Sequence, residues 1–564
     1  MPPDADAATR TVIHEPPIRI CDLPEEILHW IFELLVPLDY ESVCACLSVC
    51  RLFHAVIKCS HILCYQIRLG LEGKRDLANS SLSYAQRNAA LTMSLDRWCR
   101  LEFCSSHWLS KEVTERWDLQ NGSFAQILEE TGEILVFQLP SRTRGVVGRT
   151  LTLELDFTPD DLVLDPSQDL LVIFEQVDFS HYYFRDVGES HVLVHILKLA
   201  TGAPHPWARA PEVLHHASTE IPDALQASVF EDLVGMMTWI GPPDSPLPVG
   251  VCEWTVGNNL LVWNWKTGEL LADIIGSAIK TYTFLSHEHI MLGIIDPQNG
   301  QPLLEIWDLA NCGSARPAFR GWPRPDTTGL RLHLPFRNGD NGVSAMALDT
   351  GTGPSAYPQK NAQAPFYTPG YFGVVAATFE LAADQQCILV MDRKELLRLA
   401  LGARGSDGLV TLQWHEWGPS RTRIIPEVND GESRWITNGY RMIEHDPDRI
   451  SSGDCECGGE DQQVLRLRLY DFSPATRFRS TAEWGGTEVQ YFMEPETVTL
   501  TGADHPITTS LPFSLHRRII SCPPIGIHDA YLIRRVLLAE DGILIGVNRE
   551  DEREGKTEYI ALAI

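Results

Sequence analysis

The stretch ICDLPEEILHWIFELLVPLDYESVCACLSVCRLFHAVIKCSHILCYQI, residues 20–67, determines how the chain is organised. Its opening, Asp22-Leu23-Pro24-Glu25, is typical of a helix start, because Pro suits the first turn and acidic side chains favour the positive end of the helix dipole. Apolar residues then recur with a 3.6-residue period until Pro37 ends the helix. Asp39 and Ser48 are expected to cap two further short helices.

These helices carry more apolar surface than about fifty residues can bury among themselves. Part of that surface is therefore expected to be covered by a partner protein or by the next segment of the chain. An ordinary helical subdomain packed on its own body is the open alternative. A DNA-binding helix-turn-helix is rejected, because residues 1–60 carry nine Asp and Glu against four Lys and Arg, and duplex binding needs the opposite charge.

Two segments of the stretch, LPEEILHWIFELL and CLSVCRLFHAVI, resemble an F-box. The family pattern is matched at Leu23-Pro24, Glu26-Ile27, Ile31-Phe32, Leu35 and Val49-Cys50-Arg51-Leu52-Phe53. Many F-boxes end on a Leu-Trp pair, where this chain has Leu63-Cys64-Tyr65. The resemblance covers less than a tenth of the chain. It implies that the module binds the Skp adaptor, and through it a cullin scaffold, in an SCF-type ubiquitin ligase.

The adaptor-binding face is expected to be formed by apolar residues of these short helices. The residues assigned to it are Leu23, Pro24, Ile27, Leu28, Ile31, Phe32, Leu35, Leu38, Leu47, Val49, Cys50 and Phe53.

The composition excludes several classes of protein. The formal net charge of −29 disfavours nonspecific binding to nucleic acid or to an anionic membrane. The N-terminus has no apolar core typical of a secretory signal, and no run of eighteen apolar residues predicts a membrane span. Several of the fourteen cysteines lie on helical apolar faces, where Cys behaves as a small hydrophobe. The chain is therefore expected in the cytoplasm, the nucleus or both.

A helical connector is expected after the head. Ser83-x-x-Gln86 resembles a capping box that opens a helix reaching about Leu101. From Trp117 onward, short apolar runs alternate with turn residues, which predicts a strand-rich body. The expected strands are residues 132–139, 169–177, 191–199, 259–265, 288–295, 303–309, 386–392, 465–472 and 531–538, followed by a C-terminal hairpin of residues 543–548 and 558–564.

Weak internal repetition favours a β-propeller. The segments 197–202, 262–268 and 306–311 each run from a strand into a short turn, and Trp265 lies 43 residues before Asp308, near the length of one WD-repeat blade. Degenerate WD-type repeats are therefore expected, in a propeller of six to eight blades. Residues 203–228 are expected to form an external loop, and the C-terminal hairpin is expected to complete the first blade. An irregular pair of β-sandwiches is the alternative.

No enzyme site stands out, and no cofactor or metal is expected. A G-x-S-x-G elbow, a P-loop and an H-E-x-x-H motif are all missing from the sequence. Cys455-x-Cys457 has no second ligand pair at zinc-site spacing. His215-His216 and His287-x-His289 are isolated. Trp322–Pro325 and Trp417–Arg421 are candidate target-binding loops, and each is equally compatible with a packed corner.

The sequence therefore predicts a small all-α F-box head (19–67) behind a flexible N-terminal tail (1–18), a helical connector (68–115) and a large all-β, propeller-like domain (116–564). The function expected is that of a non-catalytic substrate-recognition subunit, with an unknown target protein held by the propeller. The alternatives are an F-box scaffold that acts outside any ligase and, less favoured, a propeller enzyme with a docking head.

Overall fold

The computed structural model describes residues 19–564 with gaps. The residues outside the description are 1–18, 78–79, 111–115, 129–130, 142–144, 179–189, 210–212, 219–223, 240–257, 277, 312–318, 321–327, 338–341, 352–364, 382–384, 407, 427–435, 447–463, 479–486, 523–526, 528–530 and 550–556.

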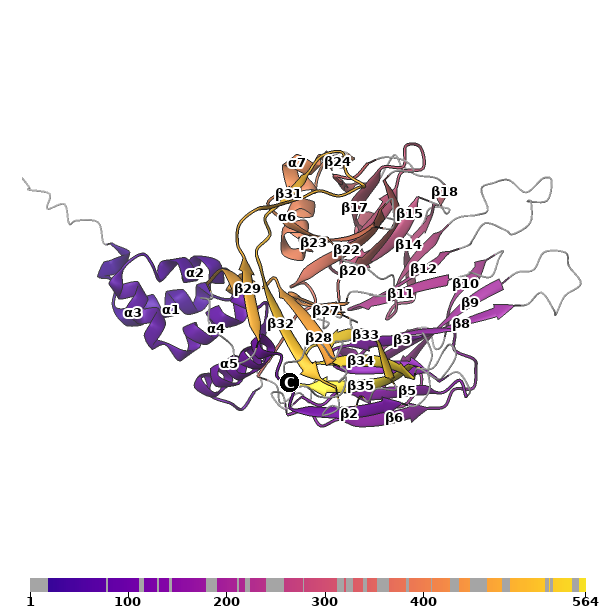
Figure 1. Cartoon of the computed structure of the whole chain (residues 1–564), viewed down its shortest axis with the longest axis horizontal. Helices are drawn as coiled ribbons and strands as arrows, with labels where there is room; N and C mark the ends of the chain where they lie inside the picture. Colours follow the sequence, from indigo (N-terminus) through magenta and orange to yellow (C-terminus); the bar gives the residue numbers. More distant parts are fainter. Residues whose placement is uncertain are drawn as a thin grey trace, which may run out of the picture.

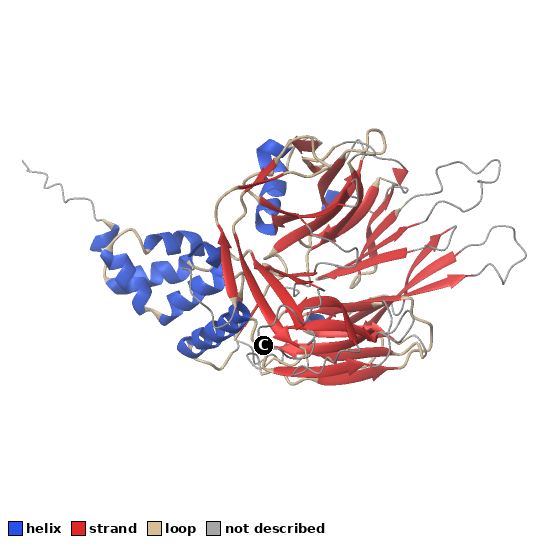
Figure 2. Cartoon of the chain, in the orientation of Figure 1, coloured by secondary structure: helices blue, strands red, loops and turns tan. Residues whose placement is uncertain are grey.

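A small helical head stands beside a large β body (Figures 1 and 2). After the 3₁₀ turn η1 (Ile20–Asp22), its helices are α1 (Glu25–Leu35), α2 (Tyr40–Cys46), α3 (Arg51–Cys59), α4 (His61–Leu71) and α5 (Tyr84–Arg100).

The helix caps agree with the sequence at two of the expected positions. Asp39 accepts a hydrogen bond from Ser42 N at 3.0 Å, and Ser83 and Gln86 form the expected capping box. The cap expected at Ser48 is wrong: α3 begins two residues later, where the Cys50 thiol accepts from Phe53 N at 3.4 Å. Because Cys is an unusual N-cap, propensity alone favoured the serine.

The described strands of the body form seven sheets of four or five strands, arranged as the blades of a propeller. Blade I contains β3 (Trp117–Gln120), β4 (Ser123–Ile127), β5 (Ile134–Gln138) and β6 (Arg149–Leu153). Blade II contains β7 (Asp161–Asp165), β8 (Leu170–Asp178), β9 (Ser190–Lys198) and β10 (Val213–Ser218). Blade III contains β11 (Ala224–Phe230), β12 (Leu233–Trp239), β13 (Asn259–Asn264), β14 (Glu269–Ile275) and β18 (Phe319–Arg320). Blade IV contains β15 (Ile279–Phe284), β16 (His289–Ile295), β17 (Pro302–Asp308), β19 (Gly329–His333) and β24 (Leu409–Leu412).

The other three blades carry the additional helices and the closing strand. Blade V contains β20 (Val343–Asp349), β22 (Val374–Leu381), β23 (Gln385–Asp392) and β25 (Thr422–Pro426), with α6 (Arg393–Ala403) and α7 (Trp414–Trp417) between its last strands. Blade VI contains β26 (Ile436–Asn438), β27 (Arg441–Asp446), β28 (Val464–Asp471), β32 (Phe513–Ser521) and β29 (Glu488–Phe492), with η7 (Pro474–Phe478) after β28. Blade VII contains β33 (Tyr531–Ala539), β34 (Gly542–Arg549), β35 (Thr557–Ala563) and β2 (Ser105–Ser110). Two small sheets, β1 (Arg75–Asp76) with β21 (Phe366–Tyr367) and β30 (Glu496–Val498) with β31 (Ile507–Thr509), lie outside the blades.

Every blade is covered by neighbours on both faces. The apolar side chains form one separate buried cluster at each of the seven junctions between consecutive blades, the junction of blade VII with blade I included. In β17 all seven residues are buried, which explains why its sequence PLLEIWD shows no alternation of apolar and polar residues. The strands expected from such runs are confirmed as β5, β8, β9, β13, β16, β17, β23, β28 and β33.

Strands from the two ends of the β domain close the ring. The strand β2 pairs with β35 in antiparallel register, with Ser105 opposite Ala563, and so completes blade VII rather than the first blade. The C-terminal hairpin therefore takes part in ring closure as expected, but the expectation that it completes the first blade is wrong, because β34 and β35 belong to blade VII and β2 supplies the closing strand. The strand β2 lies within residues 68–115, which the sequence assigned to the connector, so the β domain begins before residue 116.

The internal repeats occupy equivalent places in blades II to IV. Each of the three segments lies at the end of the third strand and in the turn that follows. Trp263 and Trp307 occupy the same position in blades III and IV, because each pairs with the second residue of the preceding strand, Val234 or Ile290. Gly202 and Gly268 have φ of 70° and 74° in these turns, a conformation that favours glycine. The expectation of an external loop at residues 203–228 is wrong in part, because β10 and the start of β11 lie within it.

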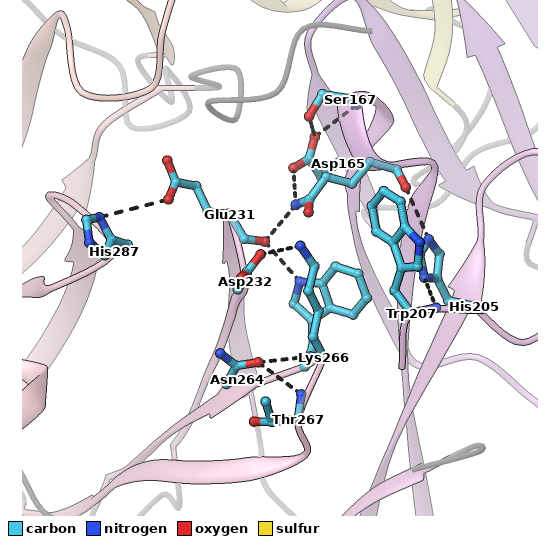
Figure 3. A network of polar contacts seen from close by, with 12 residues as sticks. Asp165, Ser167, His205, Trp207, Glu231, Asp232, Asn264, Lys266, Thr267 and His287 are labelled. Carbon is cyan, nitrogen blue, oxygen red and sulfur yellow. Dashed lines mark hydrogen bonds and ion pairs between the residues drawn. The ribbon is translucent and has the colours of Figure 1, made fainter. Parts of the chain in front are cut away.

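Polar contacts tie neighbouring blades together at their turns. Between blades II and III, Gln168 Nε2 and Trp265 Nε1 both donate to the carbonyl of Glu231, at 2.7 and 2.9 Å. Figure 3 shows this network, in which Lys266 forms an ion pair with Asp232 at 2.5 Å. These contacts give the buried backbone of the turns its hydrogen-bond partners.

Asp118 makes a similar connection between blades I and II. Its carboxylate accepts from Leu164 N of β7 at 2.9 Å and from Leu119 N at 2.8 Å. Burial among the inner strands raises the pKa of Asp118 from its ordinary value of 3.8 to about 7. The Asp118 carboxyl group therefore binds its proton more tightly in the folded protein than in the unfolded chain.

The change Asp118→Asn should alter the pH dependence of stability. As the pH rises from about 4 to about 7, Asp118 ionises in the unfolded chain before it ionises in the folded protein, so the wild-type protein loses stability over this range. Asparagine has no such proton, so the variant lacks this loss. We expect the wild-type advantage in the midpoint of thermal unfolding to be larger at pH 5 than at pH 8. The exposed Asp156→Asn is the matched control and should follow the wild-type curve. Parallel curves for wild type and Asp118→Asn would contradict the assignment.

Candidate docking surface on the helical head

The head has a core of its own. Phe32 of α1 and Phe53 of α3 meet edge to face with ring centroids 5.3 Å apart. The remaining buried residues of this core come from α1 to α4 and are Leu28, Val36, Tyr40, Val43, Val56, Ile57, Leu63 and Ile67. Leu63, in the segment where the sequence departs from the F-box pattern, is therefore part of the core.

Three residues assigned to the adaptor-binding face are not on the surface. Leu28, Phe32 and Phe53 are buried in the head core, so their assignment to a docking face is corrected. The apolar stripe of α1 is wide enough to form both a face toward the head core and an exposed face, and the 3.6-residue period alone does not tell which residue belongs to which face. Leu28 and Phe32, four residues apart, form the face that points into the core.

The other nine assigned residues reach the surface to different degrees. Leu23, Ile31, Leu47 and Cys50 are half-buried, and Pro24, Ile27, Leu35, Leu38 and Val49 are exposed. Leu38 has 84% of its surface exposed. These nine residues remain available to a partner.

Two large exposed side chains of α1 were not assigned from the sequence. Trp30 and Leu34 are 63% and 74% exposed. Together with Ile27, Leu35 and Leu38 they form what we call the α1 patch. The signal was present in the spacing, because Trp30 and Leu34 lie four residues apart and therefore on one side of the helix, and Leu38 follows in the turn after it.

A second exposed apolar pair lies near the start of α3. Ile20 and Val49 are exposed, and the pKa of Cys21 is raised by desolvation and by the neighbouring Cys50 thiol, which places the two thiols near each other. This contact holds the η1 turn beside α3. Solitary exposed apolar residues need no explanation, but their accumulation on one small module is typical of a protein-binding surface.

The helix that carries the α1 patch lies on the side of the head away from the propeller. In Figure 1, α1 and α3 lie on the far side of the head, and α4 and α5 lie between them and the blades. The head meets the turns that follow the first and third strands of blades V to VII. Lys74 approaches Glu540 of blade VII to 3.9 Å, and Lys394 of α6 forms an ion pair with Glu41 of α2 at 2.9 Å.

Polar contacts around Asp76 fix the head to the body. Arg87 of α5 donates two hydrogen bonds to the Asp76 carboxylate, at 2.7 and 2.8 Å. Tyr65 of α4 hydrogen-bonds Asp76 and the carbonyl of Pro365 in blade V, both at 3.0 Å. Burial raises the pKa of Tyr65, which therefore remains a neutral donor. The strand β1 pairs with β21 in the same region.

Apolar contacts reinforce this junction. Trp98 and Leu101, at the end of α5, belong to the core between blades VI and VII. His516 of β32 also hydrogen-bonds the carbonyl of Cys99 at 3.0 Å. Because α5 enters a propeller core, the connector holds the head in one orientation.

The other sequence candidates do not assemble a reactive centre in the described part of the chain. His289 hydrogen-bonds Ser286 at 2.9 Å, and His287 lies 3.9 Å from Glu231. Trp417 is buried as a packed corner, whereas Cys455, Cys457 and Trp322–Pro325 lie outside the described residues. Among the described side chains, no group of three or more His, Cys, Asp or Glu is arranged to hold a metal ion. No described helix is both long and apolar enough to cross a membrane.

Comparisons with known proteins find distant likeness in fold. No family model matches the chain, and no curated protein matches it. The WD40 domain of SCAP from fission yeast aligns over 81% of this chain and 94% of its own length, with 9% identity and a TM-score of 0.31. Hsv2 from Kluyveromyces lactis aligns over 62% of this chain and 78% of its own, with 9% identity and a TM-score of 0.27. A Synechocystis apocarotenoid oxygenase aligns over 52% of this chain and 61% of its own length, with 7% identity and a TM-score of 0.24.

Tyr65→Phe should loosen the junction between head and propeller. The change removes the hydroxyl that bonds Asp76 and Pro365 and leaves their oxygen atoms without that donor, at a cost of about 1–3 kcal/mol. We expect faster limited proteolysis between residues 60 and 105 and a lower unfolding midpoint. Tyr84→Phe is the matched control, because the Tyr84 ring contacts Tyr65 while its hydroxyl has no hydrogen bond among the described contacts. Equal proteolysis of both variants would contradict the anchoring role.

Proposed function

We propose that this protein is the substrate-recognition subunit of an SCF-type ubiquitin ligase. The head binds the Skp adaptor and through it a cullin scaffold, and the propeller holds a target protein. The subunit carries out no bond chemistry itself and works in the cytoplasm, the nucleus or both. Its contribution to catalysis is proximity, since a bound target presents its lysines near the ubiquitin-charged conjugating enzyme.

The observation that carries the proposal is the α1 patch. Five large apolar side chains, those of Ile27, Trp30, Leu34, Leu35 and Leu38, are exposed on or directly after one short helix. That helix belongs to the segment that resembles an F-box, and it lies on the side of the head away from the blades. Water contact with so much apolar surface is unfavourable, so a protein partner is the simplest cover for it.

The rigid junction supports the same reading. A receptor that works by proximity needs a fixed distance between its adaptor and its target. The hydrogen bond from Tyr65 to the Pro365 carbonyl and the insertion of Trp98 between blades VI and VII hold the head against the propeller. A flexible linker between head and body would leave this distance undefined.

A scaffold that binds the Skp adaptor outside any ligase is the second candidate, because the same surface serves both roles. The two functions differ in the fate of the bound target. A ligase subunit requires the cullin for turnover of that target, and a scaffold does not. For the reading as a propeller enzyme, the described residues offer no group of three or more His, Cys, Asp or Glu that could hold a catalytic metal ion.

The double variant Leu35→Lys/Leu38→Lys tests the docking surface. Both side chains are exposed, so the head should fold while its patch gains two charges that a desolvated interface disfavours. We expect at least a ~10-fold loss of affinity for purified Skp adaptor in a titration. Leu401→Lys, an exposed leucine on α6 of the propeller, is the control and should bind like wild type. Undiminished binding by the double variant would exclude this surface as the adaptor site.

A further inference from the structure

A cavity lies where the head meets blades V and VI. Its volume is about 320 Å³, at the lower end of the range for small-molecule sites. Tyr40 and Glu41 of α2 form one side, and the turns after β23 and β28 form the other. Because α4 packs against η7 beside it, the cavity belongs to the fixed junction rather than to a movable loop.

The cavity is richer in cations than the rest of this acidic protein. Four basic side chains line it, Lys394, Arg398, Arg421 and Arg477, against three carboxylates, Glu41, Asp392 and Glu395. The formal charge of the lining is therefore +1, in a chain of −29. This local excess attracts a small anion.

Three of the four cations already have acidic partners. Lys394 pairs with Glu41 at 2.9 Å, Arg421 lies 3.5 Å from Glu395, and Arg398 also pairs with Glu395. The Asp392 carboxylate caps the start of α6 through Lys394 N and Glu395 N. Arg421 shares its carboxylate with Arg398, so that single negative charge does not balance both guanidinium groups.

A buried hydroxyl without a partner among the described residues lies in the same wall. Ser473 is 4% exposed and lines the cavity, and its Oγ makes no hydrogen bond within the described part of the chain. A buried hydroxyl in this state costs free energy, and native proteins keep few of them. Arg477, four residues further on in η7, is exposed and lines the same cavity.

We propose that this cavity binds a phosphorylated small molecule, whose phosphate is held by Arg421, Arg477 and the Ser473 hydroxyl. Guanidinium groups match the oxygen atoms of a phosphate in planar, paired hydrogen bonds, and a doubly charged phosphate suits two of them. The Ser473 hydroxyl, whose oxygen has almost no accessible surface in this structure, supplies a further donor once its side chain turns toward the cavity. A small molecule is favoured over a peptide because α2 of the head closes one side of the cavity.

The ligand would join the two parts of the protein. Arg421, Ser473 and Arg477 belong to the propeller, whereas Tyr40 and Glu41 belong to the head. Binding therefore adds contacts across the junction and should raise the unfolding midpoint of the full chain. This site goes beyond adaptor docking and does not depend on it, because the α1 patch lies elsewhere on the head.

The test uses the full chain and ribose 5-phosphate as the probe, at low ionic strength where exposed charges act most strongly. We expect binding by calorimetry with a Kd below ~1 mM, and none with ribose. Arg421→Gln and Arg477→Gln should each weaken binding at least ~10-fold. Arg116→Gln, an exposed arginine paired with Asp160 on the far blades, is the control and should bind like wild type.

Ser473→Ala gives an independent readout, because it removes the buried hydroxyl without adding bulk. Its unfolding midpoint without ligand should equal or exceed that of wild type, and the increase caused by ribose 5-phosphate should be smaller. A lower midpoint without ligand would show that the hydroxyl is satisfied, and would overturn its assignment to the site.

Three further results would overturn the proposal. They are the absence of binding to the wild-type chain, equal binding by wild type and both arginine variants, and equally tight binding of succinate, which would indicate a carboxylate site. A phosphoserine heptapeptide that bound more tightly than ribose 5-phosphate would replace the small molecule with a peptide.

Discussion

Closure of the ring between β2 and β35 is the constraint on which the other features depend. Each blade buries both faces against its neighbours, so an open ring would expose two complete apolar faces, those of blades I and VII. The core between these blades contains Phe124, Phe137, Leu544 and Tyr559, which only closure brings together. The pairing of β2 with β35 therefore stabilises the junction between blades VII and I, although β2 contributes little to the core of that junction.

The same constraint positions the head. The strand β2 comes directly after α5, and the pairing that closes the ring also fixes the end of that helix. Trp98 and Leu101 are then held in the core between blades VI and VII, and the head is drawn against the turns of blades V to VII. Orientation of the proposed docking surface is thus a consequence of how the propeller closes, reinforced by the contact between Tyr65 and Pro365.

Much of the fold could be predicted from the sequence, because strands buried on both faces leave continuous apolar runs. The runs LLVW and IMLGII predict β13 and β16 without any knowledge of their neighbours. The sequence SSHWLS of β2 could not be recognised in this way, since an outer strand with an exposed Trp108 has no such run. Its place is decided by its partner strand, which no local pattern encodes.

The docking surface could be predicted only in outline. An apolar helix such as α1 gives a clear period, but Leu28 and Leu34 are equally apolar and differ only in what packs against them. The junction cavity could not be predicted, because Glu41, Asp392, Arg421 and Ser473 are distant in sequence and meet only after the blades assemble. Of these four residues, only Arg421 could be identified from the sequence, as the last residue of the candidate target-binding loop Trp417–Arg421.

Ring closure also sets an order of events during synthesis. The head and α5 leave the ribosome early, and their contacts within residues 19–101 are local enough to form at once. The edge of β2 stays without its partner until β35 has been made, after all the other blades. During that interval the α1 patch is already present while the junction that orients it is incomplete. A nascent chain of this protein would thus expose the proposed docking surface before the propeller, its proposed target platform, is complete.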